Sequence, residues 1–166
     1  EAILMAAIHG PIRLLFPMIS NIEEIRSCKE VVEEAKQALV KLGVPFADDV
    51  PIGAMIEVPA AVRLAPHLAK EVDFFSLGTN DLVQYLLAAD RDNRDIAPFF
   101  ERVHPFVVRV IRDIVAACTE RERPLDAFGF TAVSAETLPF LIGAGLRRFS
   151  IAPVVLQRFL TQMAKI

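Results

Sequence analysis

Short apolar segments alternate with longer segments of helical periodicity along the whole chain. Apolar runs of this length, most of them bounded by Gly or Pro, are typical of strands buried on both faces of a parallel sheet. The five predicted strands cover residues 12–18, 52–56, 72–77, 126–130 and 148–151. Five strands that alternate with helices indicate an α/β fold with one parallel sheet.

The segments between the predicted strands carry residues that start and stop helices. Ser20 and Asn21 are each followed by a Glu three positions later, which is the capping-box pattern. Gly43 suits the left-handed end of the same helix. Pro66 lies inside a further helical segment and predicts a kink or an early end there. The predicted helices begin after Asn21, at Pro59, at Pro105 and at Pro153.

These elements fit two architectures, a doubly wound sheet or part of a (β/α)₈ barrel. A complete barrel takes about 250 residues, whereas this chain has 166, so a barrel would be incomplete. No linker divides the sequence, and we expect residues 1–166 to form part of one domain. The amino terminus lacks an initiator methionine and the basic region of a signal peptide. We therefore expect the chain to be cut from something longer.

Composition and charge narrow the possible partners. Hydrophobic residues make up 54% of the chain, which excludes disorder, but no apolar run reaches the about 18 uncharged residues of a membrane span. The net charge of −3 argues against nucleic acid, whose binding needs a basic stripe. Because the chain is this apolar and has no membrane span, we expect part of its surface to be covered by another protein. We expect this partner to be a second copy of the chain, in a homodimer. Cys28 and Cys118 have no second cysteine or histidine nearby at the spacing of metal ligands. We therefore expect two reduced thiols in a cytoplasmic protein.

Two carboxylates follow neighbouring predicted strands. Glu57 comes directly after one strand, and Asp81 follows the next. Because the carboxyl ends of parallel strands face the active site, these side chains would lie close together and offer the oxygen ligands that Mg²⁺ prefers. Asn80 and Arg91 could then bind a phosphate group. The alternative is that Glu57 is an ordinary polar residue at a strand end and that Asn80 and Asp81 only cap a helix.

Several long motifs in this sequence match one family. They are Phe-Pro-Met-Ile-Ser at 16–20, Ile-Gly-Ala-Met-Ile-Glu-Val-Pro-Ala-Ala at 52–61, and Val-Asp-Phe-Phe-Ser-Leu-Gly-Thr-Asn-Asp-Leu at 72–82. Shorter matches follow at 84–85, 89–93, 104–105, 143–146 and 149–151. On these motifs the chain resembles the phosphoenolpyruvate-binding domain of Enzyme I of the bacterial sugar phosphotransferase system.

The resemblance implies a (β/α)₈ barrel of which this chain holds the last five strands. It also implies that Glu57 and Asp81 hold Mg²⁺ and that Asn80 and Arg91 contact the substrate phosphate. In the family, phosphoenolpyruvate gives its phosphoryl group to a histidine on a separate N-terminal domain, which passes it to a phosphocarrier protein. That domain and the first strands of the barrel, with further phosphate-binding arginines, are not in this chain.

The sequence departs from the family pattern at one strand end. Family members have Met-Cys-Gly-Glu there, and alignment without a gap from Gly143 puts Phe128 at the cysteine and Phe130 at the glutamate. The family cysteine is the acid/base at the enolpyruvate carbon, and phenylalanine has no exchangeable proton. The substitution favours a catalytically impaired regulatory module that binds phosphoenolpyruvate or pyruvate, while the overall match favours the phosphotransferase itself. A dikinase-like enzyme is a third interpretation.

The remaining polar residues have structural interpretations. His104 precedes Pro105 and is expected to cap a helix, and His9 and His67 are expected to be structural. Asp90 is placed to orient Arg91.

Overall fold

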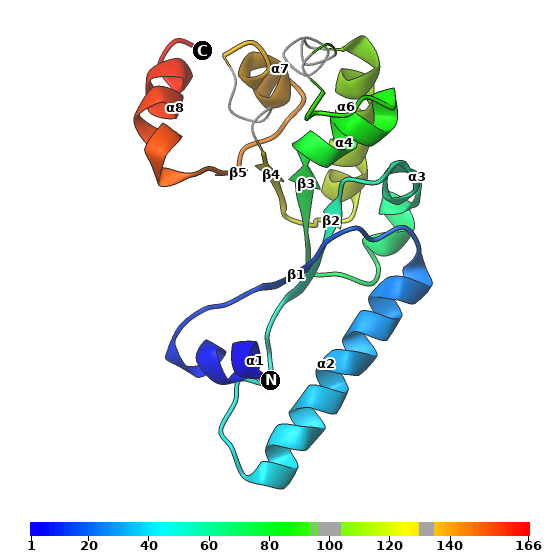
Figure 1. Ribbon diagram of the computed structural model, residues 1–166, viewed down its shortest axis with the longest axis vertical. Helices are drawn as coiled ribbons and strands as arrows, with labels where there is room; N and C mark the ends of the chain where they lie inside the picture. Colours follow the sequence, from blue (N-terminus) through cyan, green and yellow to red (C-terminus); the bar gives the residue numbers. More distant parts are fainter. Residues whose placement is uncertain (94, 96–103, 130–134) are drawn as a thin grey trace.

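The computed structural model describes residues 1–93, 95, 104–129 and 135–166. Its described strands form one parallel sheet in the order β1-β2-β3-β4-β5 (Figure 1). They are β1 (Leu14–Phe16), β2 (Ile52–Ile56), β3 (Phe74–Gly78), β4 (Leu125–Phe128) and β5 (Phe149–Ser150). A doubly wound sheet reverses its strand order at a switch point, whereas a barrel wall runs in chain order. The sheet is therefore part of a (β/α)₈ barrel, as predicted.

All five predicted strands are present, but most are shorter than predicted. The fourth ends at Phe128, and Phe130, which the sequence placed at its end, lies outside the described residues. The third begins at Phe74, and the amide of Asp73 just before it donates to the carbonyl of Ile52 at 2.8 Å.

Two short described helices precede β1, and the others follow strands along the chain. The described helices are α1 (Ala2–Ala6), η1 (Ala7–His9), α2 (Ile22–Leu42), α3 (Pro59–Leu68), α4 (Thr79–Leu87), α6 (Pro105–Glu120), α7 (Leu138–Gly143), η3 (Pro153–Val155) and α8 (Leu156–Met163). α3 continues through Pro66 and ends two residues later. α1 and α7 were not predicted, because they are too short to show a helical period. None of the described helices is both long and apolar enough to cross a membrane.

The predicted helix caps are confirmed. Asn21 Oδ1 accepts a hydrogen bond from the amide of Glu24 at 2.8 Å, and Glu24 Oε2 accepts one from the amide of Asn21 at 3.3 Å. Gly43 ends α2 with φ of 64°, in the left-handed region that glycine adopts easily. His104 caps α6, since its Nδ1 accepts a hydrogen bond from the amide of Phe106 at 3.2 Å.

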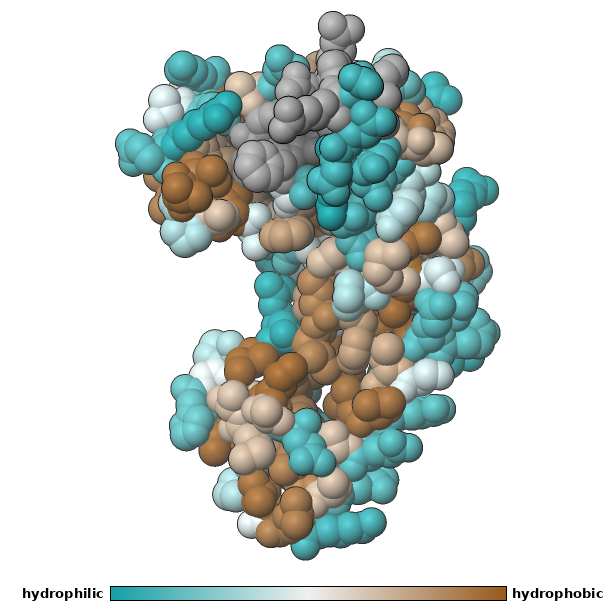
Figure 2. Space-filling view, in the orientation of Figure 1, coloured by the Kyte–Doolittle hydropathy of each residue, from teal (hydrophilic) through white to brown (hydrophobic). Residues whose placement is uncertain are grey.

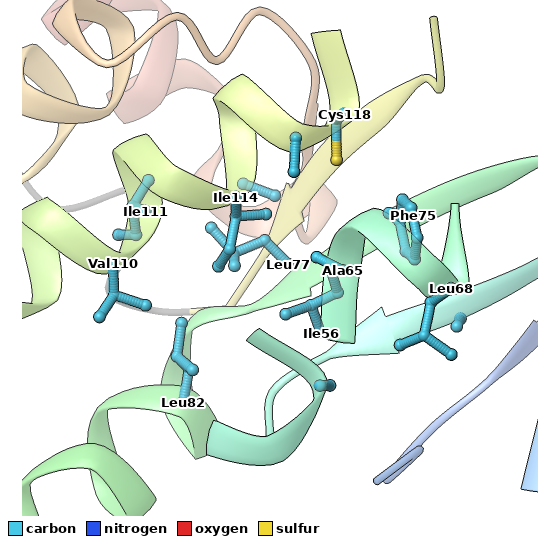
Figure 3. Packing of buried hydrophobic residues seen from close by; sticks show 14 of the residues in the cluster. Ile56, Ala65, Leu68, Phe75, Leu77, Leu82, Val110, Ile111, Ile114 and Cys118 are labelled. Atoms are coloured by element: carbon cyan, nitrogen blue, oxygen red, sulfur yellow. The ribbon is translucent and has the colours of Figure 1, made fainter. Parts of the chain in front are cut away.

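The main core lies between the sheet and the helices on its outer face. Alternate strand residues such as Ile56, Phe75 and Leu77 are fully buried, as the two-residue period of a strand dictates. Figure 3 shows them packed against side chains from three helices. The labelled helix residues are Ala65, Leu68, Leu82, Val110, Ile111, Ile114 and Cys118.

The inner face of the sheet is open. Figure 2 shows the molecule hollowed on one side, between the part that carries α8 and the part that carries α1. A cavity of about 390 Å³ lies on this face. Its walls are Arg13, Leu15, Met55, Phe74, Ser76, Asp126, Phe128 and Ser150. Arg13 lies 4.4 Å above the ring of Phe74 and 3.5 Å from a carboxylate oxygen of Asp126, so polar groups occur among the apolar ones.

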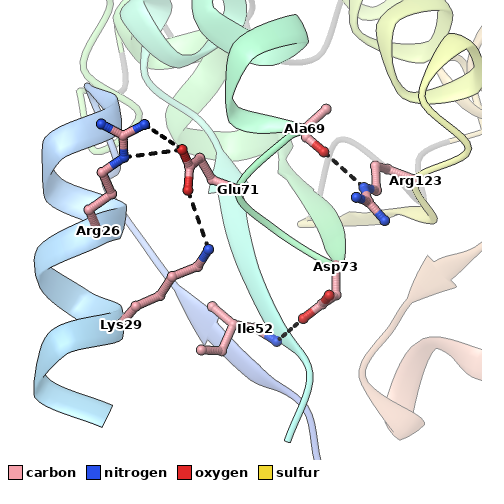
Figure 4. Close-up of polar contacts among 7 residues, drawn as sticks. All are labelled: Arg26, Lys29, Ile52, Ala69, Glu71, Asp73 and Arg123. Carbon is pink, nitrogen blue, oxygen red and sulfur yellow. Dashed lines mark hydrogen bonds and ion pairs between the residues drawn. The ribbon is translucent and has the colours of Figure 1, made fainter. Parts of the chain in front are cut away.

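Ion pairs hold α2 near the amino-terminal edge of β3 (Figure 4). Arg26 and Lys29 contact the two carboxylate oxygens of Glu71 at 2.7 and 3.4 Å. Asp73 accepts a hydrogen bond from the amide of Ile52 at 2.8 Å. These groups lie at the end of the strands opposite Glu57 and Asp81, and their role is structural.

Candidate functional site

The site lies at the carboxyl ends of β2 and β3. Glu57 is the first residue after β2, and α4 begins directly after β3, so that Asp81 lies in its first turn. β2 and β3 are paired up to Ile56 and Leu77. Pairing in this register brings the two strand ends to one place, as the sequence predicted.

Glu57 is almost fully buried, with 3% of its surface exposed. Its Oε1 accepts a hydrogen bond from the backbone amide of Met18 at 2.8 Å. Burial raises the pKa of the Glu57 carboxyl above its usual value, and the charge of Asp81 acts in the same direction. The Met18 hydrogen bond and the charge of Arg91 oppose this rise in pKa. A buried carboxylate beside a second carboxylate is a costly arrangement, and such arrangements are common at functional sites.

Gly78 makes room for the Glu57 side chain. A Cβ at this position would lie 2.5 Å from Glu57 Oε2 and 2.8 Å from the Cβ of Glu57. Such distances are too short for any residue with a side chain, so glycine is required for close approach rather than for its φ. The glycine of the Gly-Thr-Asn-Asp motif was visible in the sequence, but the neighbour that requires it was not.

Arg91 is paired with Asp81. A guanidinium nitrogen of Arg91 donates to Asp81 Oδ1 at 3.1 Å, and Gln84 Oε1 accepts from the Arg91 amide at 3.2 Å. Asp90, which the sequence placed as the partner of Arg91, instead accepts a hydrogen bond from the amide of Asp92 at 2.9 Å. Glu57, Asp81 and Arg91 thus form one electrostatic cluster. Sequence reasoning missed Gln84, whose side chain holds the backbone of Arg91.

Asn80 lies where β3 and β4 end side by side. A Cβ at Gly129, which follows β4 with φ of 118°, would lie 2.8 Å from Asn80 Oδ1 and 2.6 Å from Thr79 Oγ1. Asn80 also borders an apolar cavity of about 260 Å³, with Phe128, Ile151 and Val154 among its walls. The amide side chain of Asn80 therefore lies against the end of β4, at the border of this cavity.

Phe128 forms part of the wall of both cavities, and 49% of its surface is exposed. Phe130 lies outside the described residues. Both cysteines lie on helices rather than at the strand ends. Cys118 is buried on α6, where burial raises the pKa of its thiol to about 12. Cys28 is half-buried on α2, where burial also raises its pKa.

The donor set of the site fits a hard divalent cation. Glu57 and Asp81 supply carboxylate oxygens, and no group of three or more His, Cys, Asp or Glu side chains suited to a metal occurs among the described residues. Mg²⁺ is commonly held by one or two carboxylates, with water and substrate phosphate as its other ligands. A structural zinc site would need four nitrogen or sulfur ligands, and this cluster has none.

Known proteins resemble this chain over its whole length. A family model described as PEP-utilising enzyme, PEP-binding domain, matches residues 1–166. A phosphoenolpyruvate-protein phosphotransferase from Lactococcus lactis subsp. lactis (strain IL1403) is 42% identical over 152 residues, which are 92% of this chain and 26% of that protein. The protein of the same name from Bacillus subtilis (strain 168) is 36% identical over 166 residues, which are 100% of this chain and 29% of that protein. The chain thus spans less than a third of the length of these relatives.

Two solved structures share the fold at low sequence identity. A citrate lyase from Burkholderia xenovorans LB400 matches with a TM-score of 0.65 and 23% identity, over 96% of this chain and 51% of that chain. An HpcH/Hpal aldolase/citrate lyase family protein from Burkholderia cenocepacia J2315 matches with a TM-score of 0.60 and 16% identity, over 97% of this chain and 66% of that chain. These likenesses confirm the partial barrel and concern the fold alone.

Proposed function

The chain belongs to the family of PEP-binding domains of PEP-utilising enzymes, and from this premise we propose that it is part of a Mg²⁺-dependent phosphoenolpyruvate–protein phosphotransferase. The sequence motifs at 16–20, 52–61 and 72–82 pointed to this family, and the relatives named phosphoenolpyruvate-protein phosphotransferase support the same assignment. The parent enzyme transfers the phosphoryl group of phosphoenolpyruvate to a protein histidine. In this proposal the parent is a cytoplasmic protein that serves a phosphocarrier protein.

The observation that carries the proposal is the cluster of Glu57, Asp81 and Arg91. Glu57 is buried at the end of β2, and Asp81 is paired with Arg91 at the end of β3. A fold gains little stability from a buried carboxylate beside another carboxylate. A divalent cation and a substrate phosphate would account for the two carboxylates and the arginine. The cation neutralises the carboxylates, and the phosphate binds the arginine.

Each residue of the site has a separate task in phosphoryl transfer. Glu57 and Asp81 would hold Mg²⁺, which when bound places positive charge against the phosphoryl oxygens. Arg91 presents a planar guanidinium that binds a phosphate with two parallel hydrogen bonds. Asn80 donates its side-chain amide to the same group. Together they position the phosphoryl group and neutralise its charge, and phosphoryl transfer depends chiefly on these two effects.

Phe128 favours a second candidate function. Alignment without a gap from Gly143 puts its half-exposed ring at the position of the family cysteine. In this second candidate the parent protein binds phosphoenolpyruvate or pyruvate as a regulatory module without completing turnover. Formation of a phosphohistidine by the full-length parent protein from phosphoenolpyruvate would exclude this second candidate. Binding without phosphorylation would support it.

The metal site can be tested by titration of Mn²⁺ followed by water-proton paramagnetic relaxation. Asp81→Ala and Glu57→Gln are expected to weaken Mn²⁺ binding at least tenfold. The matched control is Asp113→Asn, which removes an exposed carboxylate from α6 and should leave binding unchanged. Equal binding by all four proteins would refute the site.

We also propose that the chain forms a homodimer through its open inner face. The cavity on this face has apolar walls at Leu15 and Met55, and uncovered apolar faces of this kind drive association. Leu15→Glu should shift the protein toward monomer, whereas Val40→Glu, on the exposed side of α2, should not. Light scattering that gave 18.4 kDa for the unaltered chain at every concentration would contradict the dimer.

A further inference from the structure

Met18 has a backbone conformation that is unusual for its residue type. Its φ is 57°, and only Ala88 and Glu122 share a positive φ among the described residues other than glycine. In this region the Cβ of an L-residue crowds the following carbonyl oxygen. Strained residues of this kind persist where the surrounding structure fixes them, and they are concentrated at functional sites.

The neighbours of Met18 hold the chain on both sides of it. Phe16 is paired with Ala54 in the sheet, Ile19 is buried with 4% of its surface exposed, and Asn21 caps α2. The Met18 side chain is itself 49% exposed. Burial of the side chain therefore does not account for the left-handed conformation of Met18. The contacts of its backbone have to account for it.

The Met18 amide is bonded to the candidate metal ligand. It donates to Glu57 Oε1 at 2.8 Å, across 39 positions of sequence. The other oxygen, Oε2, lies against the bare Cα of Gly78 at the end of β3, immediately before the helix that carries Asp81. One oxygen of Glu57 thus accepts a hydrogen bond, and the other occupies space that a side chain at residue 78 would fill.

We propose that Met18 is a positioning residue, whose left-handed backbone rather than its side chain holds the Glu57 carboxylate in the orientation that binds a divalent cation. This inference rests on the proposed function of the site. Hydrogen bonds from outer groups to metal ligands fix the ligand orientation, and their loss usually lowers metal affinity roughly 10- to 100-fold. Here the outer group is a main-chain amide, so its effect depends on the φ preference of residue 18.

Substitutions that differ in φ preference test this inference through Mn²⁺ affinity. Met18→Gly permits a positive φ and keeps the amide, so its Mn²⁺ affinity should stay within about twofold of that of the unaltered chain. Met18→Val opposes a positive φ, so its Mn²⁺ affinity should fall roughly 10- to 100-fold. The matched control is Glu122→Val, because Glu122 has φ of 53° in the turn after α6, away from the site. It should lower stability without changing Mn²⁺ affinity.

An amide-to-ester replacement at residue 18 tests the hydrogen bond even if Met18→Val fails to fold. Cys28 allows native ligation of a synthetic peptide of residues 1–27, carrying the ester, to residues 28–166, followed by refolding of the full chain. An all-amide protein made by the same route is the control. We expect the ester protein to bind Mn²⁺ roughly 10- to 100-fold more weakly.

The outcomes separate this inference from the proposed function. If the all-amide protein binds Mn²⁺ and the ester protein binds it equally well, Met18 does not position Glu57, although the metal site stands. If the all-amide protein binds no Mn²⁺, both fail. Hydrogen exchange gives a readout without metal, because protection of the Met18 amide should be lost in Glu57→Ala and kept in Met18→Gly.

Discussion

The hydroxyl of Thr79 donates a hydrogen bond to the carbonyl oxygen of Phe128 at 2.9 Å. This contact joins the first residue of α4 to the last residue of β4, and it ties together two strand ends that border the candidate site. Gly129 follows at once with a positive φ and no space for a Cβ. The position of Asn80 therefore depends on the β4 end as well as on its own helix.

Gly129→Ala should destabilise the protein. The new Cβ would meet Thr79 and Asn80, and a positive φ is strained for alanine, so we expect a loss of about 1–3 kcal/mol in the free energy of unfolding. Gly10→Ala is the matched control, because Gly10 has φ of 169° and a methyl group there would meet no atom within 4 Å. Urea denaturation measures both. A Gly129→Ala protein as stable as the Gly10→Ala protein would contradict the packing described.

Glu57→Gln should stabilise the metal-free protein at high pH. The folded pKa of Glu57 is raised, chiefly by burial, so the folded state binds this proton more tightly than the unfolded state does. Ionisation of Glu57 then opposes folding, and this effect is absent below the unfolded pKa of 4.5 and grows as the pH rises through the folded value.

Urea denaturation with a chelator at pH 4 and pH 8 checks this expectation. The free energies of unfolding of Glu57→Gln and the unaltered chain should agree at pH 4 and differ at pH 8. Saturating Mg²⁺ should reduce or reverse the difference, because it stabilises only a folded state that binds it. A Glu57→Gln protein that is less stable than the unaltered chain at pH 8 would show that burial of the charge is not costly.

Glu71 should have the opposite pH dependence. Its hydrogen bond with Arg26 is the main cause of a lowered pKa in the folded state. The stabilisation is present above the unfolded value of 4.5 and is lost as the pH falls through the folded pKa. Glu71→Gln should therefore be slightly less stable than the unaltered chain at pH 7 and equally stable near pH 2. Glu30→Gln, on the exposed side of α2, is the control and should show no such pH-dependent difference.

Thiol chemistry should report the environment of residue 128. In the unaltered chain, Cys118 has a pKa of about 12, so only about 10⁻⁴ of it is thiolate at pH 8, and it should react with Ellman's reagent only on unfolding. A thiol introduced by Phe128→Cys lies on an exposed wall of the cavity and should react much faster than Cys28 and Cys118. Slow reaction of this variant would place residue 128 out of solvent contact.

The parent protein should lack the family's proton exchange. Phe128 cannot act as a general acid at the enolpyruvate carbon, and a general acid usually contributes about 10²–10⁴ in rate. In heavy water, with Mg²⁺ and phosphorylated carrier, the full-length parent should not incorporate deuterium into the methyl group of pyruvate enzymatically. Phe128→Cys should restore part of the exchange. Stereospecific incorporation by the unaltered parent would show that another group supplies the proton.

Much of the fold could be predicted because its determinants are local. The capping box at Asn21, the left-handed Gly43 and the cap at His104 each involve residues within four positions of one another. Glu57 and Asp81 could be placed together because parallel strands that are consecutive in a barrel end side by side. α7 was missed although Pro139 near its start was a visible sign, since six residues show too little periodicity.

The pairs that shape the site could not be predicted from the sequence. Gln84 accepts a hydrogen bond from the Arg91 amide, and Asp90, the neighbour of Arg91 in sequence, accepts one from the Asp92 amide. Which side chain contacts Arg91 depends on the direction in which the chain leaves α4. Gly78 and Gly129 were visible as glycines, but the side chains that exclude a Cβ at each position come from other strands or helices.

The sequence by itself determined all five strands, the longer helices, the helix caps and which carboxylates follow neighbouring strands, because periodicity and capping act over a few residues. The tertiary structure alone decided that the Met18 amide holds Glu57, that Arg13 pairs with Asp126 across the inner face, and that this face is open. These contacts join residues 39 or more positions apart. Their geometry is fixed only when the strands pair in register, since register determines which side chains meet.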